Sequence, residues 1–158
     1  MSLAQYITRV IDAVYIQPIN RIFTRELFRY GVCGATNMTL DALWYFTIYH
    51  FVVAKQFIDL GFVVISPHIA SLIIVFPITF FTGFWLNRNV AFVATKYKTR
   101  KQLMRYGLSV VGAIALNYES MKLLIEHFNI WPTPSKLITT IISETYSFLA
   151  AKYYTFRK

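Results

Sequence analysis

Charged residues are scarce in this chain of 158 residues. They make up 15% of it, whereas a soluble domain carries about 25%. Hydrophobic residues make up 56% and aromatic residues 18%. So little polar surface cannot cover a water-soluble globule of this size. The composition therefore argues against an ordinary soluble domain and indicates an integral membrane protein.

Acidic residues are the scarcer charge, with seven Asp and Glu against sixteen Lys and Arg, for a net charge of +9. A protein that binds nucleic acid gathers its basic residues on a soluble face. Here the basic residues fall between apolar runs instead. This pattern favours membrane topology and contact with anionic lipid head groups, and it gives no support for a nucleic-acid partner.

Cysteine is almost absent. Cys33 is the only one, so the chain has no disulfide framework and no cluster of thiolate metal ligands. Cys33 lies within an apolar run, where we interpret it as a small hydrophobic residue. His50, His68 and His127 lie at the ends of apolar runs and show no metal-ligand spacing. We therefore expect neither a metal nor a cofactor.

Motifs of nucleotide-sugar enzymes are also lacking. The loops contain no Asp-x-Asp pair and no Gly-rich phosphate-binding segment. Any acid–base chemistry would have to use the acids inside apolar runs, Asp41 and Glu144. The sequence therefore argues against an enzyme.

Four apolar stretches have the roughly 20 residues needed to cross a bilayer. They are about 30–53, 67–87, 106–127 and 134–154. A chain that spans lipid must satisfy its backbone hydrogen bonds internally, so all four are predicted to be helices. Pro67 and Pro134 fall near first turns, where proline is tolerated. Pro77 lies inside the second stretch and predicts a kink or local unwinding.

Basic residues gather in three segments: the N-terminal arm, the connection between the second and third stretches, and the C-terminus. They are Arg9, Arg21, Arg25 and Arg29; Arg88, Lys96, Lys98, Arg100, Lys101 and Arg105; and Lys152, Arg157 and Lys158. The first connection holds only Lys55, and the third holds no Lys or Arg. The positive-inside rule therefore predicts that both termini and the middle connection are cytoplasmic.

The N-terminal arm, residues 1–24, lacks the compact apolar core and small-residue cleavage site of a signal peptide. Its apolar residues recur at helical spacing and predict an amphipathic helix. They are Leu3, Ile7, Val10, Ile11 and Val14. Three placements remain open: on the cytoplasmic membrane surface, packed on the cytoplasmic loop, or against a partner protein.

The chain repeats itself. A shift of 76 positions places Arg29, Tyr30 and Gly31 on Arg105, Tyr106 and Gly107, and places Asp41 on Asn117. A shift of 64 places Phe84, Arg88 and Phe92 on Phe148, Lys152 and Phe156. Both copies begin and end on the same predicted side. The fold class is therefore predicted as all-α integral membrane, with four transmembrane helices in two parallel helical-hairpin repeats after the arm. A binding site is expected where the repeats meet.

Four segments in order carry a family resemblance: RYGVCGATNMTLDALW, FWLNRNVAF, RYGLSVVGAIALNY and FLAAKYYTFR. Over residues 25–158 the chain resembles the GtrA-like family of small four-span membrane proteins. The resemblance implies translocation of a polyprenyl-phosphate-linked sugar across the bacterial inner membrane for cell-surface polysaccharide synthesis. Related spans also occur fused to polyprenyl-phosphate glycosyltransferases. A scaffold that recruits such an enzyme is the alternative.

The resemblance also marks positions. Asn37 and Asp41 match the polar pair of the family's first span, Asn87 and Arg88 match the Asn-Arg that closes the second, and Asn117 matches a polar position of the third. The chain departs from the family at Ala151-Lys152, where Asn-Arg is frequent. Lysine keeps the charge but lacks the planar fork that binds phosphate through two parallel hydrogen bonds.

Two sets of candidate site residues follow. Arg29, Arg88, Arg105 and Lys152 are expected to ring the cytoplasmic mouth, either binding lipid phosphate or serving as ordinary interfacial anchors. Asn37, Asp41, Asn87, Asn117 and Glu144 form the polar set. Asp41 lies about 16 Å beyond Tyr30 along a helix, near the bilayer centre. This set either joins helices by hydrogen bonds or lines a station for a sugar or a proton.

The bundle is small for a lipid with a long polyprenyl tail. We therefore expect a homo-oligomer, with a dimer favoured.

Overall fold

The computed structural model describes residues 3–17, 19–53, 58–59, 64–92 and 98–157. Two compact units divide the chain, Met1–Ala91 and Phe92–Lys158. Within the described residues both units are helical, apart from one pair of two-residue strands in the first. The predicted all-helical class is confirmed to that extent. Lys55, Lys96 and Lys158, which contribute to the predicted orientation, lie outside the described residues.

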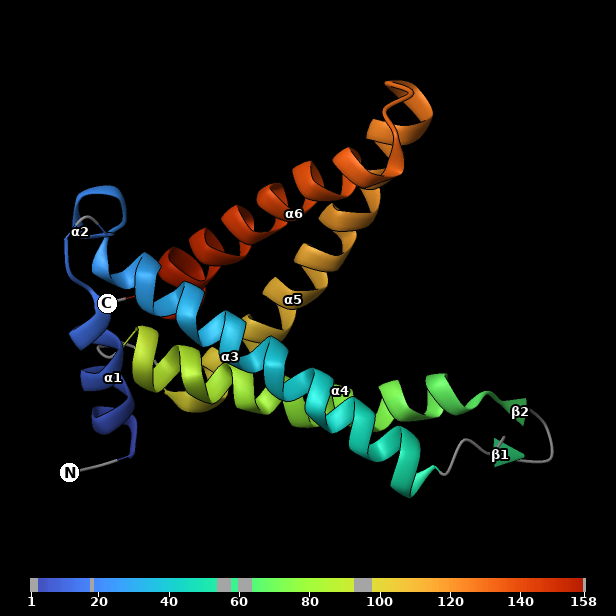
Figure 1. Ribbon diagram of the computed structural model, residues 1–158, viewed down its shortest axis with the longest axis horizontal. Coiled ribbons are helices and arrows are strands. Elements are labelled where there is room, and N and C mark those ends of the chain that lie inside the picture. Colours follow the sequence, from blue (N-terminus) through green and yellow to red (C-terminus); the bar gives the residue numbers. More distant parts are fainter. Residues whose placement is uncertain (1–2, 18, 54–57, 60–63, 93–97, 158) are drawn as a thin grey trace. The chain divides into compact units, whose positions relative to one another are not determined.

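The first unit is a helical hairpin with an N-terminal arm (Figure 1). The arm contains α1 (Leu3–Val14) and the single turn α2 (Ile19–Ile22). Helix α3 (Arg25–Thr47) continues into a π-helical segment η1 (Ile48–Val52), and α4 (Pro67–Leu86) continues into η2 (Asn87–Ala91). Between the two long helices, strands β1 (Ile58–Asp59) and β2 (Val64–Ile65) pair antiparallel, Ile58 opposite Ile65.

The first residues of α3 form a capped helix start. Thr24 has an extended backbone, and its hydroxyl accepts a 3.3 Å hydrogen bond from the backbone N–H of Leu27. Glu26 in the first turn interacts favourably with the helix dipole. These polar signals start the helix at Arg25, before the apolar stretch from which we predicted a start near residue 30.

Helices α3 and α4 pack antiparallel. Cys33 Sγ lies 3.9 Å from the Leu86 carbonyl oxygen at one end, and Ile48 packs with Ala70 and Val75 at the other. Along α4 and into η2, one row of buried residues recurs at every fourth position and is mostly small or polar: Ser71, Val75, Thr79, Gly83 and Asn87. Small residues let two backbones approach closely where no water is present to drive association.

Pro77 lies within α4, which stays α-helical from Pro67 to Leu86. Of the two outcomes predicted at this proline, local unwinding does not occur.

The second unit, described by itself, is another helical hairpin. Helix α5 (Thr99–Lys122) continues into η3 (Leu123–His127), and α6 (Pro132–Leu149) continues into η4 (Ala150–Thr155). Three side-chain contacts run down the pair and show that it is antiparallel: Ser109 with Thr155, Asn117 with Ser143, and Met121 with Thr139.

An aromatic cluster closes the second hairpin where α6 ends. The rings of Phe92 and Phe156 stack with their centroids 5.5 Å apart. The Phe148 ring lies 6.2 Å from that of Phe92, and the Tyr106 ring lies 6.3 Å from that of Phe156. Phe92 and Phe156 are among the most buried residues of the chain. The phenylalanines that reveal the repeat in the sequence are thus core residues at the end of a helix.

The four predicted stretches all fall within the long helices, but only two pass a test of length and composition for membrane spans. Among the described residues these are Ile69–Ala91 and Thr99–His127. Four spans, the parallel repeat and cytoplasmic termini therefore stay predictions. Helix α5 begins at Thr99, seven residues before the predicted start, because its first turns carry basic residues that an apolar pattern does not count.

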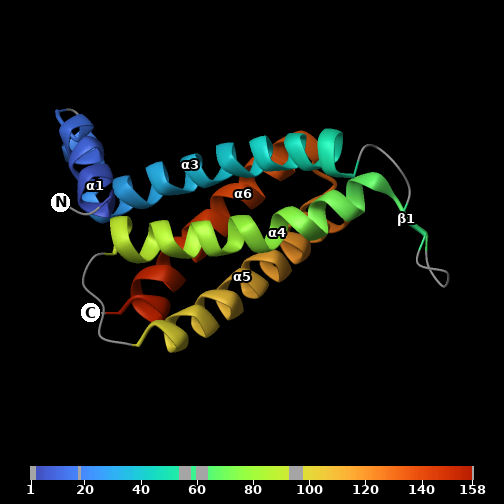
Figure 2. The ribbon, with the colours of Figure 1, turned by 90° about the horizontal axis from the view of Figure 1, so that it is seen from below.

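The arm is helical as predicted, and α1 is packed against the first hairpin. Helix α1 contacts α3 and η2 and lies across the end of the hairpin (Figures 1 and 2). Its buried residue is Ile11, whereas Leu3, Val10 and Val14 are exposed. One side of the amphipathic helix is therefore used for packing inside the unit, and another apolar side is not.

Candidate functional site

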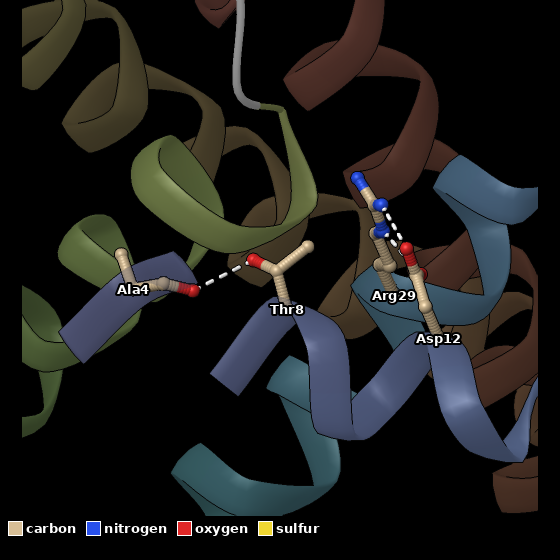
Figure 3. Close-up of polar contacts among 4 residues, drawn as sticks. All are labelled: Ala4, Thr8, Asp12 and Arg29. Atoms are coloured by element: carbon tan, nitrogen blue, oxygen red, sulfur yellow. Dashed lines mark hydrogen bonds and ion pairs between the residues drawn. The ribbon is translucent and has the colours of Figure 1, made fainter. Parts of the chain in front are cut away.

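Arg29 is held in a two-point contact with Asp12 of α1. Its Nε donates to Oδ1 at 2.8 Å and its Nη2 donates to Oδ2 at 2.5 Å (Figure 3). Both side chains are mostly shielded, with exposures of 15% for Arg29 and 30% for Asp12. The hydrogen bond from Arg29 lowers the pKa of Asp12 and raises that of the guanidinium. The first predicted phosphate ligand thus already binds an anionic group in the geometry that a phosphate uses.

Tyr15 fastens the arm at a second point. Its hydroxyl donates a 2.5 Å hydrogen bond to the Phe23 carbonyl, and its ring packs 5.3 Å from that of Phe28. The Arg25 guanidinium lies 5.8 Å from the same ring. Asp12 and Tyr15 together hold the arm against the start of α3, so the position of Arg29 depends on the arm.

Arg88 and Asn87 lie at the same end of the first hairpin as Arg29. Leu86, the residue before Asn87, contacts Cys33 through its carbonyl oxygen, and Cys33 follows Arg29 by one helical turn. Arg88 is partly exposed, and no ion pair involves it in the described part of the chain. Asn87 is buried at the first position of η2. Asn87 therefore belongs with the basic end of the hairpin rather than with Asp41.

The first hairpin contains buried amide oxygens without hydrogen-bond donors. Within the described residues, the Oδ1 atoms of Asn37 and Asn87 have no partner. The hydroxyls near Asn37 are engaged elsewhere, because Thr36 and Thr39 donate to backbone carbonyls four residues earlier, at 2.8 and 2.9 Å. An unpaired buried acceptor is costly, so each oxygen is a point where a donor on a ligand or a water would be favoured.

One face of α3 carries these groups in a row. Arg29, Cys33, Asn37 and Asp41 follow one another at every fourth position, which places them along one side of the helix. Asn37 and Asp41 are both partly buried. Helix α5 repeats the row as Arg105, Ser109, Ala113 and Asn117. Each hairpin thus has an arginine near one end and a polar side chain three helical turns further in.

The basic residues of the second hairpin are held by aromatic rings and a backbone carbonyl. Arg105 donates a 2.9 Å hydrogen bond to the Tyr154 carbonyl oxygen, and its guanidinium lies 4.8 Å from the Tyr154 ring. Lys152 Nζ lies 5.6 Å from the rings of Phe148 and Tyr153. The structure thus places Arg105 and Lys152 at one end of this hairpin, as it does Arg29 and Arg88 in the other.

The polar groups of the second hairpin mostly bind one another. Asn117 Nδ2 donates to Ser143 Oγ at 3.2 Å, and the Ser109 and Thr155 hydroxyls lie 3.2 Å apart. These contacts favour the helix-joining role for Asn117. Glu144 is exposed although its neighbour Ser143 is buried, so Glu144 does not lie in the seam between α5 and α6.

Sequence reasoning missed the row of small residues on α6 and η4, at positions 135, 139, 143, 151 and 155, all buried. The spacing in multiples of four is visible in the sequence and, under the shift of 64, falls on buried positions of α4 and η2. It also missed Gln102, fully buried, whose amide atoms have no partner within the described ranges. In the sequence Gln102 lies among basic residues, a pattern that predicts an exposed side chain.

Two helical hairpins with polar inner seams and broadly exposed apolar side chains define an integral membrane protein. The chain belongs to the family of the GtrA/DPMS transmembrane domain, whose profile matches residues 29–156. The match begins at Arg29, covers both hairpins and leaves out the arm. No curated protein and no solved structure matches the chain. Family membership associates the chain with membrane steps of glycan and polyprenyl-linked sugar processes.

Proposed function

We propose that the protein moves a polyprenyl-phosphate-linked sugar across the bacterial inner membrane, for use in cell-surface polysaccharide or glycan modification. The row on α3 is the observation that carries this proposal. It begins with Arg29, whose fork binds the Asp12 carboxylate in the geometry that a phosphate replacing this carboxylate would use, and it continues through Asn37 to Asp41, inside a hairpin whose outer side is apolar. The family membership supports the same class of substrate.

The row supplies the contacts that a sugar loses when it leaves water. Sugar hydroxyls entering hydrocarbon cost several kcal/mol each unless they find hydrogen-bond partners. The unpaired Oδ1 atoms of Asn37 and Asn87 accept such hydrogen bonds, and Asp41 extends the row inward. Asp41 itself costs at least about 2.5–3.5 kcal/mol at a bilayer centre, which favours a functional reason for its presence. The polyprenyl tail stays in lipid throughout.

The proposal includes a topology and an assembly. Four helices span the membrane as two parallel hairpins, with both termini and the middle connection in the cytoplasm. Arg29, Arg88, Arg105 and Lys152 then share the cytoplasmic side, where the phosphate is first bound. We assign no catalytic step to the chain. Two copies of the chain form the transporter, because the two hairpins of a single chain offer little surface for a long polyprenyl lipid.

The test is transport of a labelled polyprenyl-phosphate sugar in liposomes that contain the purified protein. We expect Asp41→Asn to lower the initial rate about tenfold, equivalent to about 1.4 kcal/mol in the barrier. Glu119→Gln makes the same acid-to-amide change at an exposed position of α5 and is expected to leave the rate unchanged. Equal rates for the Asp41 variant and the unchanged protein would refute the assignment of the α3 row.

A scaffold for a glycosyltransferase is the second candidate, and the arm favours it. The arm lies outside the family match and is held in a defined position by Asp12 and Tyr15. In this case, removing residues 1–20 abolishes binding of the enzyme, whereas Asp41→Asn has no effect on glycan modification. The two variants therefore separate the two functions.

A further inference from the structure

Helix α1 has a packed side and an exposed side, and both are apolar. Ile7 and Ile11 face the hairpin side with Asp12, since Ile11 is buried and Ile7 and Asp12 are partly so. Leu3, Tyr6, Val10 and Val14 are 50–66% exposed. On a helix these four fall on one side, at spacings of three and four residues. Packing against the hairpin therefore leaves a second apolar strip uncovered.

The strip continues past the end of α1. Ile16, Ile22 and Phe23 are 63%, 71% and 45% exposed. Together with Leu3, Tyr6, Val10 and Val14 they form what we call the arm strip. Its position is fixed, because Asp12 binds Arg29 and the Tyr15 ring packs on Phe28, both on α3. A strip of this kind marks a contact surface and not a loosely ordered tail.

The charged residues near the arm strip indicate which kind of surface the strip contacts. Arg9 and Arg21 are exposed on the same arm, and Arg25 is exposed directly after it, at the start of α3. The one acid of α1, Asp12, is already paired with Arg29. The outer side of the arm therefore combines apolar side chains with exposed arginines at its edge, which is the composition of helices that bind anionic membrane surfaces.

The orientation of α1 also indicates that the arm strip contacts a membrane. Helix α1 lies across the end of the hairpin, at a steep angle to α3 and α4 (Figures 1 and 2). When α3 and α4 cross a membrane, a helix in this position lies along the membrane plane. The exposed apolar side chains of α3, among them Met38, Leu43 and Phe46, bring lipid up to the same hairpin.

We infer that the arm strip is buried in the head-group region of an anionic lipid membrane, and that α1 thereby sets the depth of Arg29 relative to the lipid phosphates. Asp12 is the link, since it is on the lipid-bound helix and holds the Arg29 fork (Figure 3). The inference goes beyond translocation and holds for a scaffold as well, so its test requires no transport measurement.

The test uses the full chain with a fluorescent label at a single cysteine. Cys33→Ser removes the native thiol, and Ser is acceptable there because Ser109 stands at the matching position of the second copy. Val10→Cys places the label in the arm strip, and Gln5→Cys places it on the exposed polar edge of the same helix. The protein is reconstituted in vesicles of phosphatidylcholine and phosphatidylglycerol.

We expect a nitroxide attached to the lipid to quench the label at position 10 at least severalfold more than the label at position 5, and iodide in the water to show the reverse order. Equal iodide quenching at the two positions would place the strip in water and overturn the inference. A label at position 10 that neither quencher reaches would mean that a protein, such as a second copy, covers the strip, which also overturns it.

Replacing Arg9, Arg21 and Arg25 together by Gln tests the electrostatic part. We expect lipid quenching at position 10 to fall at least twofold in anionic vesicles, and high salt to reproduce that fall with the unchanged arginines. Quenching that stays the same in both conditions, and in vesicles of phosphatidylcholine alone, would contradict the requirement for anionic lipid.

Discussion

At the scale of single residues, the contact between Asp12 and Arg29 joins the arm to the membrane hairpin. We expect Asp12→Asn to loosen α1, because an amide cannot accept both hydrogen bonds of the fork. The measurement is hydrogen exchange at residues 3–14 in detergent, where exchange should become faster while that of α4 stays unchanged. Asp59→Asn, in the strand connection, is the matched control. Unaltered exchange in α1 would show that its apolar packing alone holds the arm.

The same contact predicts a dependence on pH. The hydrogen bond from Arg29 lowers the pKa of Asp12 from its ordinary value of 3.8, so the contact stabilises the docked arm fully above that value. The stabilisation is lost as the pH falls through the lowered pKa. The protection factors of the α1 amides, which remove the intrinsic pH dependence of exchange, should therefore be constant between pH 8 and 5 and should fall only below about pH 4. The Asp12→Asn variant should show no such fall.

Gly112 lies against the side chain of Tyr146 on α6. A Cβ at this position would overlap the hydroxyl of Tyr146, whereas a Cβ at Gly31 or Gly34 would meet nothing within 4 Å. We expect Gly112→Ala to destabilise the second hairpin by about 1–3 kcal/mol, as overpacking does. Gly34→Ala is expected to be neutral or stabilising by up to about 1 kcal/mol. Thermal unfolding in detergent measures both, and adding Tyr146→Phe should recover part of the loss from Gly112→Ala.

At the scale of elements, each hairpin is held by a helix side with a small residue at every fourth position. Thr139 is fully buried in that side of α6, and its neighbour Thr140 is exposed. We expect Thr139→Leu to destabilise the second hairpin by about 1–3 kcal/mol, because the larger side chain pushes α5 away. Thr140→Leu adds the same atoms on the outer side and should be tolerated. Equal unfolding temperatures for the two variants would mean that the small-residue side does not determine the packing.

The elements also show where sequence reasoning works. Apolar runs predicted the four long helices, because length and hydrophobicity require a helix in lipid. They did not predict the four π-helical ends, since one extra residue per turn leaves no mark in an apolar pattern. The start of α5 was predicted too late, because Arg100, Lys101 and Gln102 continue the helix outside the apolar run.

Candidate site residues were chosen by their position along a helix, without knowledge of the residues that they contact. The repeat identified Arg29, Asp41 and Asn117 by position alone. It could not reveal that Asp12 binds Arg29, because the two residues are 17 apart and Asp12 belongs to α1, which has no counterpart in the second copy. Similarly, Glu144 was grouped with the polar set by depth, but one residue along a helix turns a side chain from the seam to the exposed side.

At the scale of the whole molecule, the proposed topology predicts which positions are reachable from each side of the membrane. Lys98→Cys and Trp131→Cys, in a Cys33→Ser background, place thiols at exposed positions next to opposite ends of the hairpin of α5 and α6. A membrane-impermeant thiol reagent should label position 131 in intact spheroplasts and position 98 only in inverted vesicles. Labelling of both positions from one side would refute a spanning hairpin.

The chain enters and leaves a helical hairpin at the same end. In the first hairpin, α3 begins and η2 ends near the contact between Cys33 and Leu86. A gene for such a unit can be duplicated in tandem and both copies keep the same orientation in the membrane. A unit with an odd number of crossings would emerge inverted in its second copy and would need its charges rearranged. The proposed parallel repeat would therefore meet no topological barrier to doubling, and the aspartate of one copy and the asparagine of the other would be free to diverge in role.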